Sequence, residues 1–142
     1  MENEAHLSCA DFGEVYTGRH DWTDYTVQYE LKPVLGKHHF VNFRVQGAIR
    51  SYAAGFCPGG KFGLYKNENG YRKLAEKKFS WEKGKTYTVS VTVKGSKITA
   101  SVDDKKILEY NDINKPYLYG CTGLSVREGS HCVCSGIKVK GL

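Results

Sequence analysis

Apolar and polar residues alternate along most of this chain, which is the pattern of strands with one buried face. In residues 86–94 every second side chain is apolar and favours a strand (Tyr87, Val89, Val91 and Val93). Gly95–Ser96 then turns the chain, and residues 98–102 alternate in the same way. A third apolar run, residues 106–110, follows the next polar turn. The three runs predict an antiparallel meander.

The same alternation recurs on both sides of this meander. We expect further strands over residues 25–31, 40–45, 50–56, 62–65, 123–127 and 136–139. Short segments rich in Gly, Asn, Asp or Pro separate these strands, and no apolar period of 3.6 residues persists. About ten strand candidates at this spacing predict an all-β fold. Two antiparallel sheets packed as a β-sandwich satisfy the alternation.

The chain has 142 residues, of which 40% are hydrophobic, and it shows no linker or break in composition. We therefore expect one domain over residues 1–142, with residues 1–10 as an extended or flexible lead-in. The longest uncharged apolar stretch, residues 51–57, is too short to cross about 30 Å of hydrocarbon. Residues 1–6 lack the features of an export signal. The expected location is the cytoplasm, unless the chain is a domain excised from a larger protein.

The five cysteines, which are Cys9, Cys57, Cys121, Cys132 and Cys134, cannot all pair within one chain. No Asn-x-Ser/Thr glycosylation site occurs, so we expect reduced thiols. The thiols of the Cys132-x-Cys134 motif would share one face of a strand, as half of a metal site. Since no second Cys or His pair has matching spacing, we interpret them as small packed side chains and expect no metal.

The formal net charge is +6, which permits attraction to polyanions. However, the basic residues of segment 72–85 are interspersed with acidic ones, as on an ordinary solvated surface. We therefore do not expect nucleic-acid binding. The sequence also has no Gly-x-Ser-x-Gly elbow, no His-Glu-x-x-His motif, no phosphate loop and no dinucleotide fingerprint. These absences favour a binding module over an enzyme.

Hydrogen-bonding side chains gather on the polar faces of three predicted strands. If Val41 and its alternates face the core, then Asn42, Arg44 and Gln46 lie together on the opposite face. We place Arg50 and Tyr52 on the same exterior side. The other alternation, with Tyr52 and Phe56 in the core, remains open.

Near the end of the chain, Leu124 and Val126 are expected in the core. Ser125 and Arg127 would then project outward beside Glu128. Guanidinium groups, amides and aromatic rings on one rigid sheet suit a polyhydroxylated ligand. The same arginines could instead form solvated cross-strand pairs with acidic residues. Trp22 and Trp81 are either stacking platforms or packed side chains.

Five segments resemble the concanavalin A-like, or laminin-G-like, jelly-roll superfamily. They are Asp21–Tyr25, Asn42–Val45, Gly84–Val91, Gly120–Ser125 and Gly136–Val139. Together they span most of the chain. The resemblance implies a two-sheet antiparallel jelly roll.

Within that superfamily, residues 22–52 and 64–71 are similar to non-catalytic carbohydrate-binding modules. Such modules occur beside fructan-degrading enzymes and in bacterial ADP-ribosylglycohydrolase-like proteins. The resemblance implies a terminal sugar or short oligosaccharide as ligand, and a catalytic domain in the parent polypeptide as partner. It also places Arg44 on a strand that carries a ligand-contacting arginine in related modules, and Arg127 with Glu128 near another polar site.

In this expectation the arginines bind hydroxyl pairs, Glu128 accepts from a hydroxyl and orients an arginine, and Tyr52 stacks on a sugar ring. Many relatives hold structural calcium with an early Asp and an acidic residue before the final strand. This chain has Cys134–Ser135–Gly136 there, so we expect no cofactor, with calcium as the open alternative. Two other functions remain open: a docking domain accessory to an ADP-ribosylglycohydrolase, and a glycosidase acting on 3-keto-glycosides.

Overall fold

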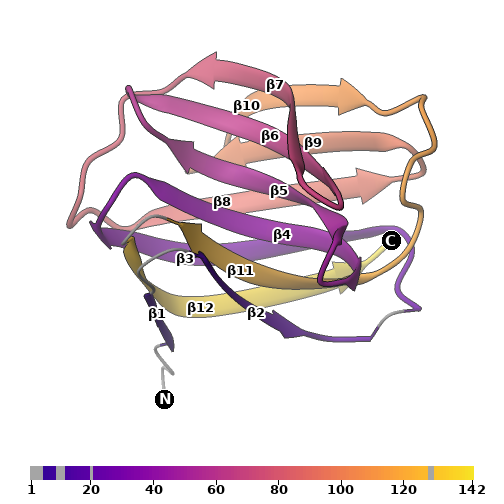
Figure 1. The fold of residues 1–142 in the computed structure, drawn as a ribbon, viewed down its shortest axis with the longest axis horizontal. Helices are drawn as coiled ribbons and strands as arrows, with labels where there is room; N and C mark the ends of the chain where they lie inside the picture. The colour runs from indigo at the N-terminus through magenta and orange to yellow at the C-terminus, as the bar shows by residue number, and fades with distance from the viewer. Residues whose placement is uncertain (1–4, 9–11, 20, 128–129) are drawn as a thin grey trace.

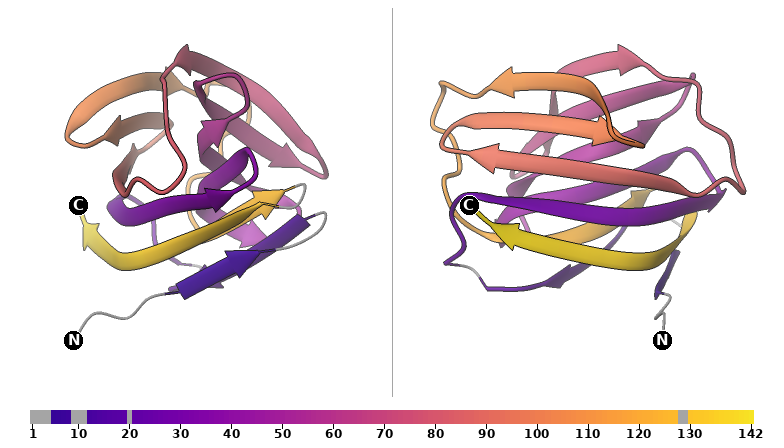
Figure 2. Two further views of the ribbon diagram at one scale, coloured as in Figure 1. Left: turned by 90° about the vertical axis from the view of Figure 1, so that its left-hand side faces the viewer. Right: turned by 180° about the vertical axis from the view of Figure 1, so that it is seen from behind.

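The computed structural model describes residues 5–8, 12–19, 21–127 and 130–142. Within these ranges the chain forms twelve strands, arranged as two six-stranded antiparallel sheets. The sheets pack face to face (Figures 1 and 2). The predicted all-β sandwich is therefore confirmed. Among the described residues, no helix is long and apolar enough to span a membrane.

Each sheet combines segments that are distant in sequence. Sheet A contains, in spatial order, β1 (Ala5–Ser8), β12 (His131–Gly141), β3 (Tyr25–Leu35), β8 (Tyr87–Lys94), β9 (Lys97–Val102) and β10 (Lys105–Asn111). Sheet B contains β2 (Phe12–Thr17), β11 (Cys121–Arg127), β4 (His38–Gly47), β5 (Arg50–Cys57), β6 (Lys61–Glu68) and β7 (Tyr71–Lys78). The predicted meander corresponds to β8, β9 and β10.

The core lies between the sheets because strand alternation directs apolar side chains inward. In β3 and β8, buried and half-buried residues alternate without interruption from the first residue to the seventh. Their buried side chains pack against Phe43, Phe56 and Leu64 of sheet B. The strict alternation of these two central strands explains why the sequence pattern located them correctly.

The sheets differ from the sequence prediction at several points: strands β1, β2 and β7 were not expected, and β3 and β12 extend beyond their expected ranges. Segment 72–78, for which we expected a solvated surface and no strand, forms most of edge strand β7, whose side chains are exposed or half-buried without a regular alternation. Strand β3 also continues through Pro33, beyond the end at residue 31 that we expected. The last β3 residue that pairs with β8 is Leu31, so Pro33 lies beyond that ladder, where a missing backbone donor is tolerated.

The four cysteines in the described part of the chain are buried free thiols: Cys57, Cys121, Cys132 and Cys134. Burial, followed by the neighbouring Cys134 thiol, raises the pKa of Cys132 to about 12. These side chains pack as the sequence interpretation expected for Cys132 and Cys134. Cys9 lies outside the described residues. Across the described ranges, no three His, Cys, Asp or Glu side chains gather to hold a metal ion.

Candidate functional site

Arg44 does not lie on the outer face of the sheet, so that part of the sequence prediction is wrong. Strand β4 is bulged at this point: the four-residue step from Phe43 to Gly47 is matched by only two residues of β5. Arg44 itself has a left-handed backbone, with φ of 49°. The extra residues break the two-residue period, and the side chain is only 1% exposed. Gly120 allows this close approach, since a Cβ there would lie 2.4 Å from the Arg44 carbonyl carbon.

The Arg44 guanidinium is bound by protein oxygens. Its Nε donates to the Thr23 carbonyl (2.9 Å), and Nη1 donates to the carbonyls of Gly95 (2.6 Å) and Tyr117 (2.8 Å). Its Nη2 donates to Asp24 Oδ1 at 3.0 Å. With these donors occupied, Arg44 ties three loops to β4, which is a structural role rather than the ligand contact that we expected.

Tyr52 is also buried, so its predicted exterior position is wrong and the alternative, with Tyr52 and Phe56 in the core, is confirmed. The Tyr52 ring stacks on Phe43, its cross-strand neighbour, at 5.5 Å between centroids. Its hydroxyl donates to Asp112 Oδ2 at 2.6 Å. Every residue of β5 after Arg50 is buried, on both faces of the sheet, so the pattern of apolar residues could not decide which alternation faces the core.

The remaining predicted site residues do not converge on one patch. Gln46 is half-buried and donates to the Tyr119 carbonyl (3.1 Å), whereas Arg50 is exposed above the Tyr117 ring. Arg127 pairs with His38 in the backbone register of β11 and β4, and its side chain is not described. Glu128 lies outside the described residues. Asn42 does face outward on sheet B, although it is fully buried.

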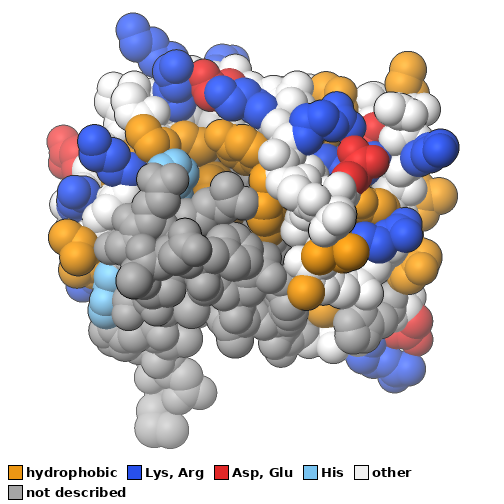
Figure 3. Space-filling model, in the orientation of Figure 1, with side chains coloured by type: hydrophobic (Ala, Val, Ile, Leu, Met, Phe, Trp, Pro, Cys, Tyr) orange, Lys and Arg blue, Asp and Glu red, His pale blue; other side chains and the backbone are white. Residues whose placement is uncertain are grey.

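The outward face of sheet B carries a second apolar cluster, separate from the core. Phe40, Ala53 and Cys57 form its buried part, and Tyr65 and Tyr71 pack against them. In the register of β5 and β6, Ala53 lies opposite Tyr65. In Figure 3 hydrophobic side chains, a class that includes tyrosine, are exposed on this face beside a histidine. Lys and Arg side chains lie along its upper rim (Figure 3).

The rings of this cluster surround a hollow of about 70 Å³, lined by His38, Phe40, Tyr65 and Tyr71. We call it the aromatic hollow. Small residues make room for it: a Cβ on Gly63 would lie 2.8 Å from the Tyr65 ring. Phe40 and Tyr65 meet edge to face, with 5.5 Å between their centroids. The hollow has room for about two water molecules, so it fits one ring edge or substituent of a larger ligand.

Asn42 holds one side of the aromatic hollow in place. Its amide nitrogen donates to the Tyr71 hydroxyl (3.0 Å), and its amide oxygen accepts from Ser125 Oγ (2.5 Å). Ser51 Oγ lies at the limit of hydrogen bonding from the same nitrogen, at 3.5 Å. Asn42 and Ser125 therefore position an aromatic side chain, and the tyrosine presents the surface that a ligand would meet.

The groups around the aromatic hollow carry defined protonation states. Burial raises the pKa of the Cys57 thiol, which lies 3.6 Å from the Tyr65 hydroxyl, so this cysteine stays protonated near neutral pH. On the rim, the carboxylate of Glu76 accepts from Lys73 and Lys61, and these bonds lower its pKa. The Cys57 thiol beside the hollow is therefore neutral, and the Glu76 carboxylate is paired with two lysines.

In the sequence, Tyr65 and Tyr71 flank Gly-rich or Asn-rich loops, and we interpreted each as either a stacking platform or a packed side chain, without placing the two together. The signal that could have paired them is the run of small residues at outward positions, Ala53, Gly55 and Gly63. Small side chains on one face of a strand leave space above the sheet that a neighbouring aromatic ring can occupy. Trp81, by contrast, packs near Phe56 and donates to the Cys57 carbonyl (2.9 Å), as the packing interpretation expected.

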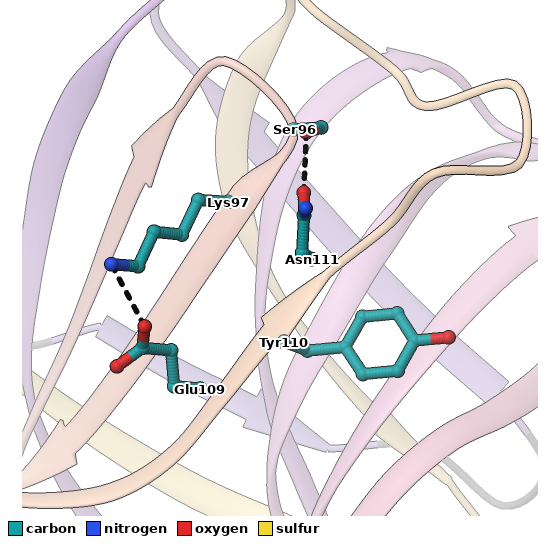
Figure 4. A pocket seen from close by; sticks show the side chains of 5 residues that line it. All are labelled: Ser96, Lys97, Glu109, Tyr110 and Asn111. Carbon is teal, nitrogen blue, oxygen red and sulfur yellow. Dashed lines mark hydrogen bonds and ion pairs between the residues drawn. The ribbon is translucent and has the colours of Figure 1, made fainter.

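A larger and more open depression lies on the outward face of sheet A. It has a volume of about 580 Å³ and is lined by Ser96, Lys97, Glu109, Tyr110 and Asn111 (Figure 4). Its charged groups neutralise one another: Lys97 and Lys106 both bind Glu109 and lower its pKa to about 2. Ser96 is likewise bound to Asn111. These internal pairs leave little for a ligand to bind, so the aromatic hollow is the stronger candidate.

No protein family and no curated protein matches this sequence. Solved structures do match. The carbohydrate-binding module CBM66 from Bacillus subtilis aligns over 99% of this chain and 92% of its own, with a TM-score of 0.86 at 18% identity. The chain has the concanavalin A-like jelly-roll fold.

Other jelly rolls match at lower similarity. The galectin LEC-6 from Caenorhabditis elegans covers 96% of both chains, with a TM-score of 0.61 at 14% identity. The exoplasmic domain of VIP36, in a form bound to Ca²⁺ and Man3GlcNAc, covers 98% of this chain and 84% of its own, with a TM-score of 0.67 at 11% identity. At these identities the similarity shows the fold.

Proposed function

We propose that this jelly roll binds carbohydrate through the outward face of sheet B, with the aromatic hollow as the primary contact. The main observation behind this proposal is that Phe40, Tyr65 and Tyr71 converge around one hollow. Asn42 holds one side of it in place through its hydrogen bond to Tyr71. The C–H face of a sugar ring packs on aromatic rings, and its hydroxyl groups exchange hydrogen bonds with phenols and imidazoles. The fold, which CBM66 and the lectins share, supports this function.

The size of the hollow indicates how a saccharide would lie. A volume of about 70 Å³ is smaller than one sugar residue, so a terminal residue would insert an edge while the rest of the ligand crosses the sheet. This geometry suits a terminal sugar or a short oligosaccharide.

The proposal changes the residues assigned to the site. Asn42 is retained as a positioning residue for Tyr71, whereas Arg44 and Tyr52 are removed because they are buried and bound by the protein. Arg127 and Glu128 stay proposed ligand contacts. The described lining of the hollow contains no carboxylate, whereas glycoside cleavage commonly uses two, so we propose binding without turnover. A catalytic domain elsewhere in the parent polypeptide stays the proposed partner.

A glycan array, followed by titration calorimetry with the saccharide it selects, tests this function. Tyr65→Ala and Tyr71→Ala should each weaken binding about tenfold, which corresponds to the loss of about 1.4 kcal/mol of stacking and packing. Tyr119→Ala is the matched control, because this tyrosine is exposed on a loop outside the hollow. Its affinity should equal that of the wild type.

Two results would contradict the proposal. Binding to no glycan on the array would favour the docking-domain alternative. Equal losses in Tyr65→Ala and Tyr119→Ala would show that the saccharide does not use the aromatic hollow. Release of a product from the bound glycoside would instead favour the glycosidase alternative.

A further inference from the structure

A second hollow lies at one end of the sandwich, where the β4–β5 and β6–β7 turns approach the loop before β11. It has a volume of about 330 Å³ and is lined by Ile49, Arg50, Glu68, Asn69, Lys115 and Tyr117. We call it the end hollow. Asn69 in its wall is two residues from Tyr71 of the aromatic hollow, so the β6–β7 turn lies beside both. A ligand on the outward face of sheet B could therefore reach it.

Arg50 is oriented in the end hollow but not neutralised there. Its guanidinium carbon lies 5.1 Å from the centroid of the Tyr117 ring, a cation–π contact that favours one side-chain position. Tyr117 is itself fixed, because its hydroxyl donates to the Asn67 carbonyl (2.7 Å) and its backbone nitrogen donates to Tyr52 Oη (3.0 Å). Among the described residues, Arg50 makes no hydrogen bond or ion pair, so its guanidinium donors remain available.

The charges around this hollow leave an excess of cations. The Lys115 ammonium has no ion-pair partner among the described residues, while its carbonyl accepts from buried Lys66 at 3.0 Å, which fixes the backbone. The one acidic group, Glu68, already accepts from Arg72 at 2.8 Å, and this bond lowers its pKa. Two uncompensated cations therefore share the hollow with one neutralised carboxylate.

The remaining wall residues suit a sugar ring. Ile49 is 52% exposed and offers an apolar surface, and Asn69 supplies an exposed amide. A guanidinium binds a carboxylate through two parallel N–H···O bonds, and an ammonium adds a point charge. A planar acid attached to a sugar ring would match both the charge and the apolar surface.

We propose that the end hollow binds the carboxylate of an acidic saccharide, such as a hexuronic acid residue, next to a sugar held in the aromatic hollow. This inference rests on the proposed carbohydrate-binding function and specifies its ligand class. Arg50 pairs with the carboxylate, and Lys115 adds attraction. The sequence prediction of Arg50 as a ligand contact thereby gains a defined partner.

Three pairs of probes test this proposal on an array and by calorimetry: trigalacturonic acid and its methyl ester, a hyaluronan hexasaccharide and its methyl ester, and 3′-sialyllactose and lactose. In at least one pair the acidic member should bind about tenfold more tightly, the range of one charge-assisted hydrogen-bond pair. Arg50→Gln should abolish this preference without changing the affinity for the neutral member. Lys97→Gln is the matched control: it also removes one positive charge, but from sheet A, and this variant should keep the preference for the acidic member.

The outcomes separate this proposal from the function on which it rests. If neutral glycans bind through Tyr65 and no acidic member is preferred, the end hollow does not bind a carboxylate, while the proposed carbohydrate-binding function stands. Binding of no glycan overturns both. A preference that survives Arg50→Gln also overturns the proposal. Since Arg50 is exposed, the variant should keep the thermal unfolding midpoint of the wild type, which excludes misfolding as the cause.

Discussion

Arg44 and His39 show how single buried polar residues in β4 support the face that we assign to ligand binding. Arg44 donates to oxygen atoms from three separate loops. His39 is fully buried on the core side of β4, five residues before Arg44, and is within hydrogen-bonding distance of the Gly36 carbonyl (3.1 Å). Both residues flank the outward-facing pair Phe40 and Asn42. Substitution of either residue should therefore lower the free energy of unfolding and should not remove a direct ligand contact.

Arg44→Ala should lower the free energy of unfolding by about 3 kcal/mol, because it leaves three carbonyls without their guanidinium donor and removes the counter-ion of Asp24. This loss lies at the lower end of the range for removing one partner of a buried ion pair, because the Asp24 side chain is 38% exposed and can be solvated. Urea denaturation measures this change. A fully stable variant that has lost glycan affinity would contradict the structural role and restore Arg44 as a ligand contact.

His39 should make the protein less stable in mild acid. Burial, together with the charges of His38, Lys83 and His131, lowers its pKa to about 4, against 6.5 for an ordinary histidine. Between these values the unfolded state binds more protons, so stability falls as the pH decreases from about 6.5 to about 4. The total loss is about 3 kcal/mol, at 1.36 kcal/mol per pKa unit.

The measurement is urea denaturation at pH 7 and pH 4.5, for the wild type and for His39→Gln. The variant cannot titrate at this position, so its stability should change less between the two pH values. Asp112, whose pKa is lowered because bonds from Lys66 and Tyr52 outweigh its burial, loses its contribution only at more acidic pH. An unchanged pH dependence in His39→Gln would show that other groups cause the acid sensitivity.

At the scale of elements, the loop between β10 and β11 is attached to sheet B through one buried ion pair. Lys66 Nζ of β6 donates to Asp112 Oδ2 (2.7 Å) and to the carbonyls of Asn114 and Lys115. All three ammonium donors are thereby used. Because this loop supplies Tyr117 and Lys115, the pair also shapes the end hollow.

Lys66→Met should destabilise the protein by about 3–5 kcal/mol, because it leaves the buried Asp112 carboxylate without a counter-ion. The double variant Lys66→Met/Asp112→Leu removes both charges and should cost less than the sum of the two single variants. Chemical denaturation of the four proteins in this cycle measures the coupling. Additive effects would show that the pair contributes no interaction of its own.

The sequence predicted those elements in which the two-residue period holds, and it failed where other forces set the geometry. Alternation placed β3, β8 and β9 because each has one buried face. It missed most of β7, an edge strand without one, and it misplaced Arg44 because the bulge in β4 cannot be read from hydropathy. It misplaced Tyr52 because β5 is buried on both faces, which leaves its two alternations indistinguishable. The partner of Tyr52, Asp112, is 60 residues away, so only the folded chain brings them together.

In the whole molecule, we propose that the two sheets have different roles: sheet A contributes the central strands of the core, and sheet B binds the ligand. Sheet A supplies β3 and β8, the central strands of the core, and its outward depression is occupied by internal ion pairs. Sheet B presents the aromatic hollow, and the end hollow contains Arg50 and Lys115, which have no ion-pair partner among the described residues. Asn69 of the end hollow is two residues from Tyr71 of the aromatic hollow, which is why we propose that one oligosaccharide spans both.

Amide chemical-shift mapping with the array-selected saccharide tests the central claim, that the outward face of sheet B is the binding surface. We predict the largest shifts at Phe40, Asn42, Tyr65 and Tyr71, with smaller shifts at Arg50 and Lys115 when the saccharide is acidic. Amides of β9 and β10 in sheet A should not move. Shifts concentrated around Lys97 and Asn111, with sheet B unaffected, would contradict the account.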